Sequence, residues 1–199
     1  YPVSFLAWTT TPWTLPSNTA LAVGEKIDYV QIETFNPYTS EPICVIIAES
    51  LISSYFNAEG KDASFEEYNS ESKIIPYKII GKFTGKELEG IRYEQLIPWI
   101  KPNGDAFRVI IGDYVTTEDG TGIVHIAPTF GADDARVGKE NNIPPLHLID
   151  KDLNNRPMVD LTGKFYKIED LDPNFVKEFV NVEEYSKYAG KYVKNAYDK

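Results

Sequence analysis

The stretch AWTTTPWTLPSN (residues 7–18) places hydroxyl groups, indole rings and prolines side by side. Three threonines follow a tryptophan, and Pro12 and Pro16 interrupt what comes after them. The apolar and β-branched residues YPVSFLAWTTT (1–11) predict a strand, which the prolines then end. A strand edge accounts for the threonines and a turn accounts for the prolines. Neither accounts for the combination, so the rest of the chain has to explain it.

The size and composition of the chain are those of an ordinary globular protein. Its 199 residues are enough for one generous domain or two small ones. Without repeats or a clear linker, a single domain over 1–199 is the simplest count. The only cysteine, Cys44, has apolar neighbours, which predicts a buried small hydrophobe and excludes an intrachain disulfide. No apolar run reaches membrane-span length, so we expect no membrane partner. The lack of an intrachain disulfide fits a reducing compartment, and we expect a cytoplasmic location.

The net charge of −10 limits the partners of the chain. It argues against broad nucleic-acid binding driven by counterion release. It is compatible with the binding of one strand end in a local groove.

Apolar alternation predicts strands through most of the chain. We expect two paired strands around Gly24, a buried strand that becomes helical near Glu49, an exposed polar excursion, and two strands around a turn at Asp119 and Gly120. The corresponding segments are 19–23 with 28–35, 42–56, 63–72 and 107–128, with further strands in 73–97, 145–150 and 156–161.

Helices are expected mainly in the second half of the chain. The segment 132–142 begins with acids and is typical of a short helix. The segment 172–199 has helical spacing of its aromatic residues. The fold class is therefore mixed α/β and β-rich, with a curved or barrel-like sheet and peripheral helices.

Generic catalytic motifs are missing. The sequence has no phosphate-binding Walker loop, no dinucleotide fingerprint, no zinc-binding spacing and no serine-hydrolase elbow. The two histidines are His125 and His147. His147 alternates with leucines and is interpreted as a structural strand residue.

The second distinctive stretch is GTGIVHIAPTFGADD (120–134). Its glycines permit close approach of backbone or ligand. His125 ends an apolar strand, a position that is more often structural than catalytic. Asp133 and Asp134 stand where a helix begins, so they can hold an ammonium group or cap the helix, and for Asp133 capping is at least as well supported.

Taken together, WTTTPWTLPSN and GTGIVHIAPTFGADD resemble the two signature segments of the editing domain of isoleucyl-tRNA synthetases. The order and separation of the segments match across essentially the whole chain. Valyl and leucyl enzymes resemble this domain but have an arginine and an acid in the first segment, whereas the corresponding residues of this chain are Thr10, Thr11, Pro12 and Trp13, without an arginine or an acid. The sequence APTFG resembles that of the eukaryote-like branch of the family, which also occurs in some bacteria.

The resemblance implies the editing-domain fold shared by the valyl, isoleucyl and leucyl enzymes. It also implies a domain excised from a larger class I synthetase, without the synthetic site. The activity implied is hydrolysis of valyl-tRNA(Ile), after and possibly before transfer, by a second sieve that excludes isoleucine. The implied partners are the 3′ end of tRNA(Ile) carrying valine and the rest of the parent synthetase. No cofactor and no metal are implied.

The resemblance also assigns roles in the first segment. Thr9, Thr10 and Thr11 line the pocket, with Thr10 and Thr11 among the catalytic positions. Thr11 and Asn18 hold the attacking water, and Trp8 forms a wall beside the terminal adenosine or the aminoacyl group.

In the second segment, Asp134 pairs with the α-ammonium group of the substrate. His125 limits the space for the side chain, and it is not assigned as general base. Lys139 can guide the strand end, although a solvated helix lysine is the more ordinary interpretation. For Thr14 and Thr19, a strand end with turn residues stays an open alternative.

Three other functions stay open at this stage. The chain can be a non-catalytic insertion that binds the tRNA 3′ end, although the intact Thr-rich loop, His125 and Asp134 argue against it. It can be a freestanding deacylase that acts in trans, against which its mid-strand start argues. It can also be the editing domain of a sister valyl enzyme, which the Thr-Pro-Trp wording disfavours.

Overall fold

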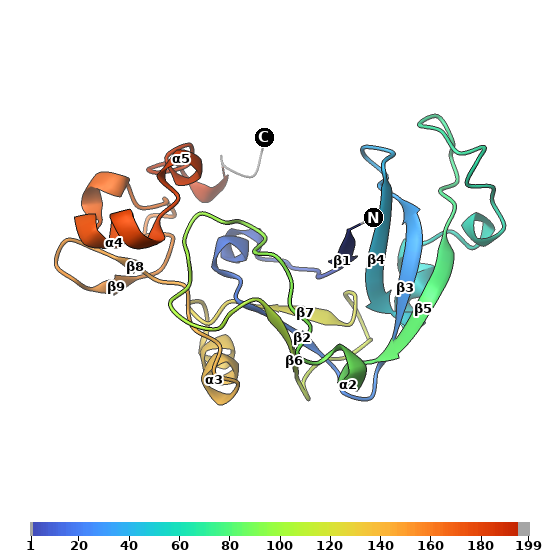
Figure 1. Ribbon diagram of the computed structural model, residues 1–199, viewed down its shortest axis with the longest axis horizontal. Helices are drawn as coiled ribbons and strands as arrows, with labels where there is room; N and C mark the ends of the chain where they lie inside the picture. The colour runs from blue at the N-terminus through green and yellow to red at the C-terminus, as the bar shows by residue number, and fades with distance from the viewer. Residues whose placement is uncertain (1, 195–199) are drawn as a thin grey trace. The chain divides into compact units, whose positions relative to one another are not determined.

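A computed structural model describes residues 2–194, and the chain in it forms two compact units (Figure 1). Each unit is assembled from three segments. The first unit takes residues 2–9, 22–91 and 109–124, and the second takes 10–21, 92–108 and 125–194. This division does not test independent folding, so the single domain over 1–199 stays a prediction. Residue 1 of the expected first strand and residues 195–199 of the expected last helix lie outside the described residues.

The first unit is built on a four-stranded sheet in the order β1-β4-β3-β5, whose main strands run side by side in Figure 1. Its strands are β1 (Val3–Phe5), β3 (Asp28–Phe35), β4 (Pro42–Ala48) and β5 (Lys78–Thr84). β3 pairs antiparallel with β4 and β5, and β1 pairs parallel with β4. The alternation in β3 buries Val30, Ile32 and Thr34 and turns the residues between them outward, as expected for a half-buried strand.

Short helices follow β4 and β5 in the first unit. β4 continues into the 3₁₀ helix η2 (Glu49–Leu51) and then α1 (Ile52–Tyr55), which confirms the predicted change near Glu49. A further 3₁₀ helix, η3 (Ala58–Lys61), precedes the exposed excursion. Cys44 is buried in β4, as expected.

Fully buried Tyr29 connects two distant turns of the first unit. Its hydroxyl accepts a hydrogen bond from the Gly24 amide at 3.0 Å and donates one to the Gly122 carbonyl at 2.6 Å. Gly122 has φ +73°, and a Cβ there would lie 2.5 Å from the Ala48 side chain, so only glycine fits. The tyrosine therefore holds the glycine-rich turn that leads into β7.

A second sheet has the order β6-β2-β7, with β2 (Ala20–Val23), β6 (Arg108–Ile111) and β7 (Ile123–Ile126). The boundary between the two units falls within each of these strands. β2 is buried along its whole length, which fits a central strand between two neighbours.

The second unit contains most of the helices. Its elements are η1 (Pro12–Ser17), α3 (Ala132–Glu140), β8 (Leu148–Ile149), β9 (Asn155–Arg156), η4 (Ile168–Asp170), α4 (Pro173–Phe179) and α5 (Val182–Tyr185). Strands β8 and β9 form a small antiparallel sheet. Trp99 packs edge-on against Phe165 and stacks on Tyr188, within a core that also holds Leu146, Leu148, Met158, Leu171 and Tyr185.

The mixed, β-rich class is confirmed, and several details differ from the expectation. Among the described residues the strands form three separate sheets, and no barrel closes. The predicted pairing of β2 with β3 is wrong, because β2 pairs with β6 and β7 while β3 pairs with β4 and β5. The two strands expected around Asp119 both exist, but β2 lies between them.

Two of the expected elements are shorter than predicted or of another type. The strands expected after Thr84 are replaced by α2 (Gly85–Leu88), because the Glu87 carboxylate accepts hydrogen bonds from the Thr84 amide and hydroxyl and so starts a helix. The late helical segment breaks at Val180, which is extended, and Asn181 then caps α5 by accepting from the Glu184 amide.

The Tyr29→Phe substitution tests the anchoring of the Gly122 turn. It leaves a buried amide and a buried carbonyl without their shared partner, so we expect the free energy of unfolding to fall by about 1–3 kcal/mol. Urea denaturation measures the change, and Tyr38→Phe serves as control because Tyr38 is 93% exposed. Equal stability of the two variants would contradict the role of Tyr29.

Candidate functional site

The Thr-rich loop folds as a short 3₁₀ helix in the second unit. Pro12 begins η1, where its fixed φ suits a first helical position and its missing amide costs no hydrogen bond. The Thr14 amide donates to the Thr11 carbonyl at 3.0 Å, and the Asn18 amide donates to the Leu15 carbonyl at 3.0 Å. The Thr19 amide then donates to the Ile126 carbonyl at 3.0 Å, which fixes the end of the loop against the end of β7.

Asn18 is buried beside β7 with its whole amide group hydrogen-bonded. Its nitrogen donates to the Ala20 carbonyl at 2.9 Å and to His125 Nδ1 at 2.8 Å. Its oxygen accepts from the Tyr93 hydroxyl at 2.6 Å. The Ala20 carbonyl can only accept, so it determines which end of the amide is nitrogen. Asn18 therefore acts as a donor toward His125.

His125 is a neutral ring whose two nitrogens are both engaged. Since Nδ1 accepts from Asn18, the ring proton sits on Nε2, which donates to the Thr14 hydroxyl at 2.9 Å. Thr14 in turn donates to the Thr11 carbonyl at 2.8 Å. The side chain is only 9% exposed, and this burial lowers the pKa of His125 to about 4. His125 is therefore uncharged near neutral pH.

Asp134 lies in the first turn of α3, just beyond the same strand end. Its Oδ2 accepts a hydrogen bond from the Ala127 amide at 2.9 Å. Burial raises the pKa of Asp134, the nearby Asp133 charge raises it further, and the Ala127 amide opposes both. Among residues 2–194, no cation contributes to this pKa. A positive group placed here would thus stabilise the ionised carboxylate and lower its pKa.

The helix cap before Asp134 is Gly131, which has φ +86°. Asp133 is exposed in the first helical turn, so it does not cap the helix. Lys139 is exposed near the other end of α3, which agrees with an ordinary solvated lysine.

The structure brings five of the predicted site residues into the second unit: Thr10, Thr11, Asn18, His125 and Asp134. A continuous path of hydrogen bonds leads from the Thr11 carbonyl through Thr14 to His125. Two residues further along the chain, Ala127 binds Asp134. The parts of the two segments that lie in the second unit, residues 10–18 and 125–134, are therefore joined by hydrogen bonds.

Two members of this arrangement were missed in the sequence. Thr14 could be interpreted from the sequence as an ordinary turn residue, yet its hydroxyl forms a hydrogen bond with His125, 111 positions away. Tyr93 carried no signal at all, because its link to Asn18 spans 75 positions. No local pattern encodes either contact.

Trp8 and Thr9 belong to the first unit. Trp8 is 54% exposed and lines a hollow of about 210 Å³ with Tyr114, Thr116, the turn 119–122 and the start of β7. The Tyr55 hydroxyl binds the Gly120 carbonyl of that turn at 2.8 Å. The roles expected of Trp8 and Thr9 in a substrate pocket stay predictions.

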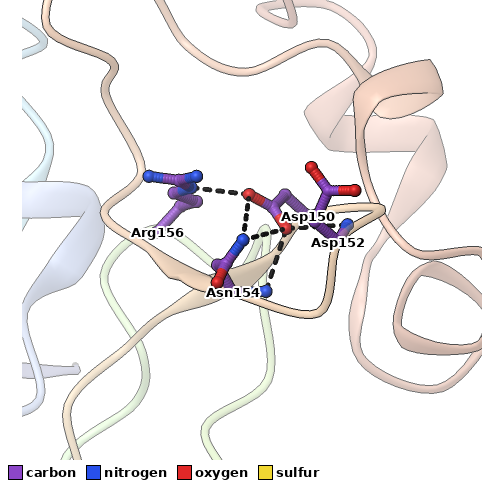
Figure 2. Close-up of polar contacts among 4 residues, drawn as sticks. All are labelled: Asp150, Asp152, Asn154 and Arg156. Atoms are coloured by element: carbon purple, nitrogen blue, oxygen red, sulfur yellow. Dashed lines mark hydrogen bonds and ion pairs between the residues drawn. The ribbon is translucent and has the colours of Figure 1, made fainter.

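A larger hollow of about 590 Å³ lies beside the turn between β8 and β9. Figure 2 shows the polar contacts of this turn, where Asp150 accepts from the Asp152 and Asn154 amides and pairs with Arg156 at 2.6 Å. These bonds satisfy the carboxylate internally, and they hold its pKa below the ordinary range. We interpret this cluster as one that stabilises the turn between β8 and β9.

Between residues 2 and 194, no group of three or more His, Cys, Asp or Glu side chains is placed to hold a metal ion. In the same range, every helix is too short or too polar to cross a bilayer. The expected lack of a cofactor stays a prediction.

Known proteins resemble this chain in sequence and in fold. It is 60% identical to an isoleucine–tRNA ligase of Bacteroides fragilis and 59% identical to one of Porphyromonas gingivalis, each over 98% of this chain. In both comparisons the chain spans 17% of the length of the relative. No protein-family model matches the chain. These relatives do not test the expected eukaryote-like branch.

Two solved structures share the fold at low sequence identity. GlLeuRS-CP1 superposes with a TM-score of 0.52 at 17% identity, covering 77% of this chain and 57% of that chain. The editing domain of the P. falciparum cytosolic leucyl-tRNA synthetase superposes with a TM-score of 0.50 at 15% identity, covering 76% and 56%.

The depressed pKa of His125 predicts a specific pH dependence of stability. In the unfolded chain a histidine has a pKa of about 6.5. As pH falls from 6.5 toward 4, the unfolded state takes up this proton before the folded state does. The stability contributed by neutral His125 is thus complete above pH ~6.5 and is lost as pH falls toward the folded pKa of about 4.

An NMR titration of the His125 ring should therefore show a midpoint near 4. The unfolding free energy of wild type should also fall more steeply between pH 6.5 and 4 than that of His125→Ala. A midpoint near 6.5 would contradict the buried neutral ring.

Proposed function

We propose that this chain, which belongs to the isoleucine–tRNA ligases and has the editing-domain fold, hydrolyses the ester between valine and the 3′ end of tRNA(Ile). The observation that carries the proposal is the joining of the Thr-rich loop to the strand end before Asp134, through neutral, buried His125. The remaining parts of the ligase supply most of the tRNA contacts.

The need for such an activity follows from the size of one methylene group. A hydrophobic pocket discriminates by only about 1–3 kcal/mol for each methylene, and it cannot exclude a smaller side chain by its shape. A second pocket that is too small for isoleucine can accept valine and remove it. The chain therefore needs a group that holds the amino acid and a wall that limits its side chain.

Asp134 is the group that holds the amino acid. Its half-buried carboxylate has a raised pKa because of burial and the Asp133 charge. An α-ammonium group beside it compensates both effects and gains charge-assisted hydrogen bonds. The Ala127 amide fixes the orientation of the carboxylate before the substrate arrives.

His125 is the wall. Because both of its nitrogens are bonded to Thr14 and Asn18, its ring presents only carbon atoms to a ligand. A rigid apolar edge of this kind suits the rejection of one extra methylene. The same bonds leave no free nitrogen to take a proton from water, so a role as general base does not fit this geometry.

The loop around Thr10 and Thr11 positions the attacking water. Thr10 is exposed and Thr11 is partly buried. An aminoacyl ester is already activated, so a well-placed water and an adjacent ribose hydroxyl of the tRNA suffice. Asn18 was expected to hold this water, but its amide is already hydrogen-bonded to Ala20, His125 and Tyr93. We therefore propose that Asn18 positions His125 instead.

The Asp134→Asn substitution tests the ammonium site. It removes the charge but keeps an oxygen that can accept from the Ala127 amide. Loss of a charge-assisted contact of about 1.5–3 kcal/mol predicts a fall of roughly 10- to 150-fold in kcat/KM for valyl-tRNA(Ile) deacylation. The matched control is Asp133→Asn, which removes an exposed charge from the same helical turn and should stay within about twofold of wild type. Equal activities of the two variants would remove the ammonium role.

The His125→Ala substitution tests the sieve. The space released should let isoleucyl-tRNA(Ile) be deacylated at least about tenfold faster than in wild type, as expected for one methylene. The control is His147→Ala, a half-buried histidine of the same unit that alternates with buried Leu146 and Leu148. Unchanged selectivity in His125→Ala, with the fold intact by circular dichroism, would rule out the sieve.

A further inference from the structure

Tyr93 lies at the outer end of the hydrogen-bond path that reaches the Thr-rich loop. Its amide donates to the Phe107 carbonyl at 3.0 Å, and its ring packs edge-on against Phe107 at 6.0 Å. Both contacts hold the ring in place. Burial raises the pKa of Tyr93, so its hydroxyl keeps its proton and can donate to Asn18.

The four hydrogen bonds that start at Tyr93 all run in one direction. Tyr93 donates to Asn18 at 2.6 Å and Asn18 donates to His125 Nδ1 at 2.8 Å. His125 Nε2 donates to Thr14 at 2.9 Å, and Thr14 donates to the Thr11 carbonyl at 2.8 Å. Hydrogen bonds in such a series polarise one another, so each strengthens the next.

The direction of the series depends on the tautomer of His125. With the proton on Nδ1, the ring would face the amide nitrogen of Asn18 donor to donor. Nε2 would then accept from Thr14, and the Thr14 hydroxyl would release the Thr11 carbonyl. A change at the ring is thus transmitted to the loop that carries Thr10 and Thr11.

We propose that Tyr93 is a positioning residue, which orients Asn18 and thereby holds His125 as the Nε2–H tautomer and the Thr-rich loop in its active geometry. The effect of Tyr93 on catalysis rests on the proposed function, whereas the effect of Tyr93 on the His125 tautomer does not. Removing the hydroxyl leaves the buried Asn18 oxygen without its donor. The amide is then held only at its nitrogen, by the Ala20 carbonyl and His125, so its orientation loosens and the contact that fixes the His125 proton on Nε2 weakens.

The test compares Tyr93→Phe with Tyr185→Phe. Tyr185 is fully buried in the same unit, and its hydroxyl donates to the Tyr166 carbonyl at 2.6 Å, outside the path to His125. Both substitutions remove one buried hydroxyl with an equally short bond, so both should lower stability to a similar degree. Only one of them should affect His125.

Two measurements are made on wild type and both variants. Nitrogen-15 NMR of the chain reports which ring nitrogen of His125 carries the proton. Deacylation of valyl- and isoleucyl-tRNA(Ile), with the chain in its full-length ligase, reports activity and selectivity. Wild type and Tyr185→Phe should show the Nε2–H tautomer alone.

Tyr93→Phe should show a mixture of tautomers, with valyl-tRNA(Ile) deacylation reduced roughly three- to tenfold, as for the loss of one buried hydrogen bond. Its preference for valyl over isoleucyl esters should fall as well. An unchanged tautomer in Tyr93→Phe, or the same change in Tyr185→Phe, would overturn the positioning role. A wild-type ligase that fails to deacylate valyl-tRNA(Ile) would instead overturn the proposed function, so the two failures are read from different measurements.

Discussion

The arrangement of the second unit around its site depends on one buried, uncharged imidazole. One ring nitrogen of His125 accepts a hydrogen bond and the other donates one, and both partners come from the segment 14–18. A charged ring in the same place would have to donate to Asn18, whose amide nitrogen can only donate. Neutrality is therefore a condition of the contact. Under the proposed function, it also suits the ring to the part of an inert wall.

The electrostatics of the site and of the whole chain point to a division of labour. A net charge of −10 repels a polyanion, so the chain by itself is poorly suited to capture tRNA. A half-buried carboxylate whose pKa is raised is, in contrast, well suited to a small cationic group. Under the proposed function, this local chemistry suits the aminoacyl end of the substrate, and the remaining parts of the ligase would bind the nucleic acid.

Local patterns in the sequence predicted the elements but not their long-range partners. Three local patterns were enough to predict an element each, because each depends only on how that segment is exposed or buried. They are the alternation in β3, the apolar run of β4 and the acidic start of α3, and all three elements exist. The pairing of β2 with β6 and β7 depends on residues far along the chain, and it was missed. The capping pair of Thr84 and Glu87 was visible in the sequence, but the surrounding alternation favoured strands. Within the candidate site, the second motif pointed to His125 and Asp134, whose roles stay predictions, whereas the contacts of Thr14 and Tyr93 could be recognised only once the backbone had brought them to His125 and Asn18.

The most direct test of the account is a crystal structure of the chain with a non-hydrolysable valyl-adenosine analogue. We predict that the α-ammonium group lies within hydrogen-bond distance of Asp134, about 2.7–3.2 Å. The valyl methyl groups should lie against the carbon atoms of the His125 ring, with the ester facing Thr10 and Thr11. Density for the aminoacyl group away from both Asp134 and His125 would contradict the account.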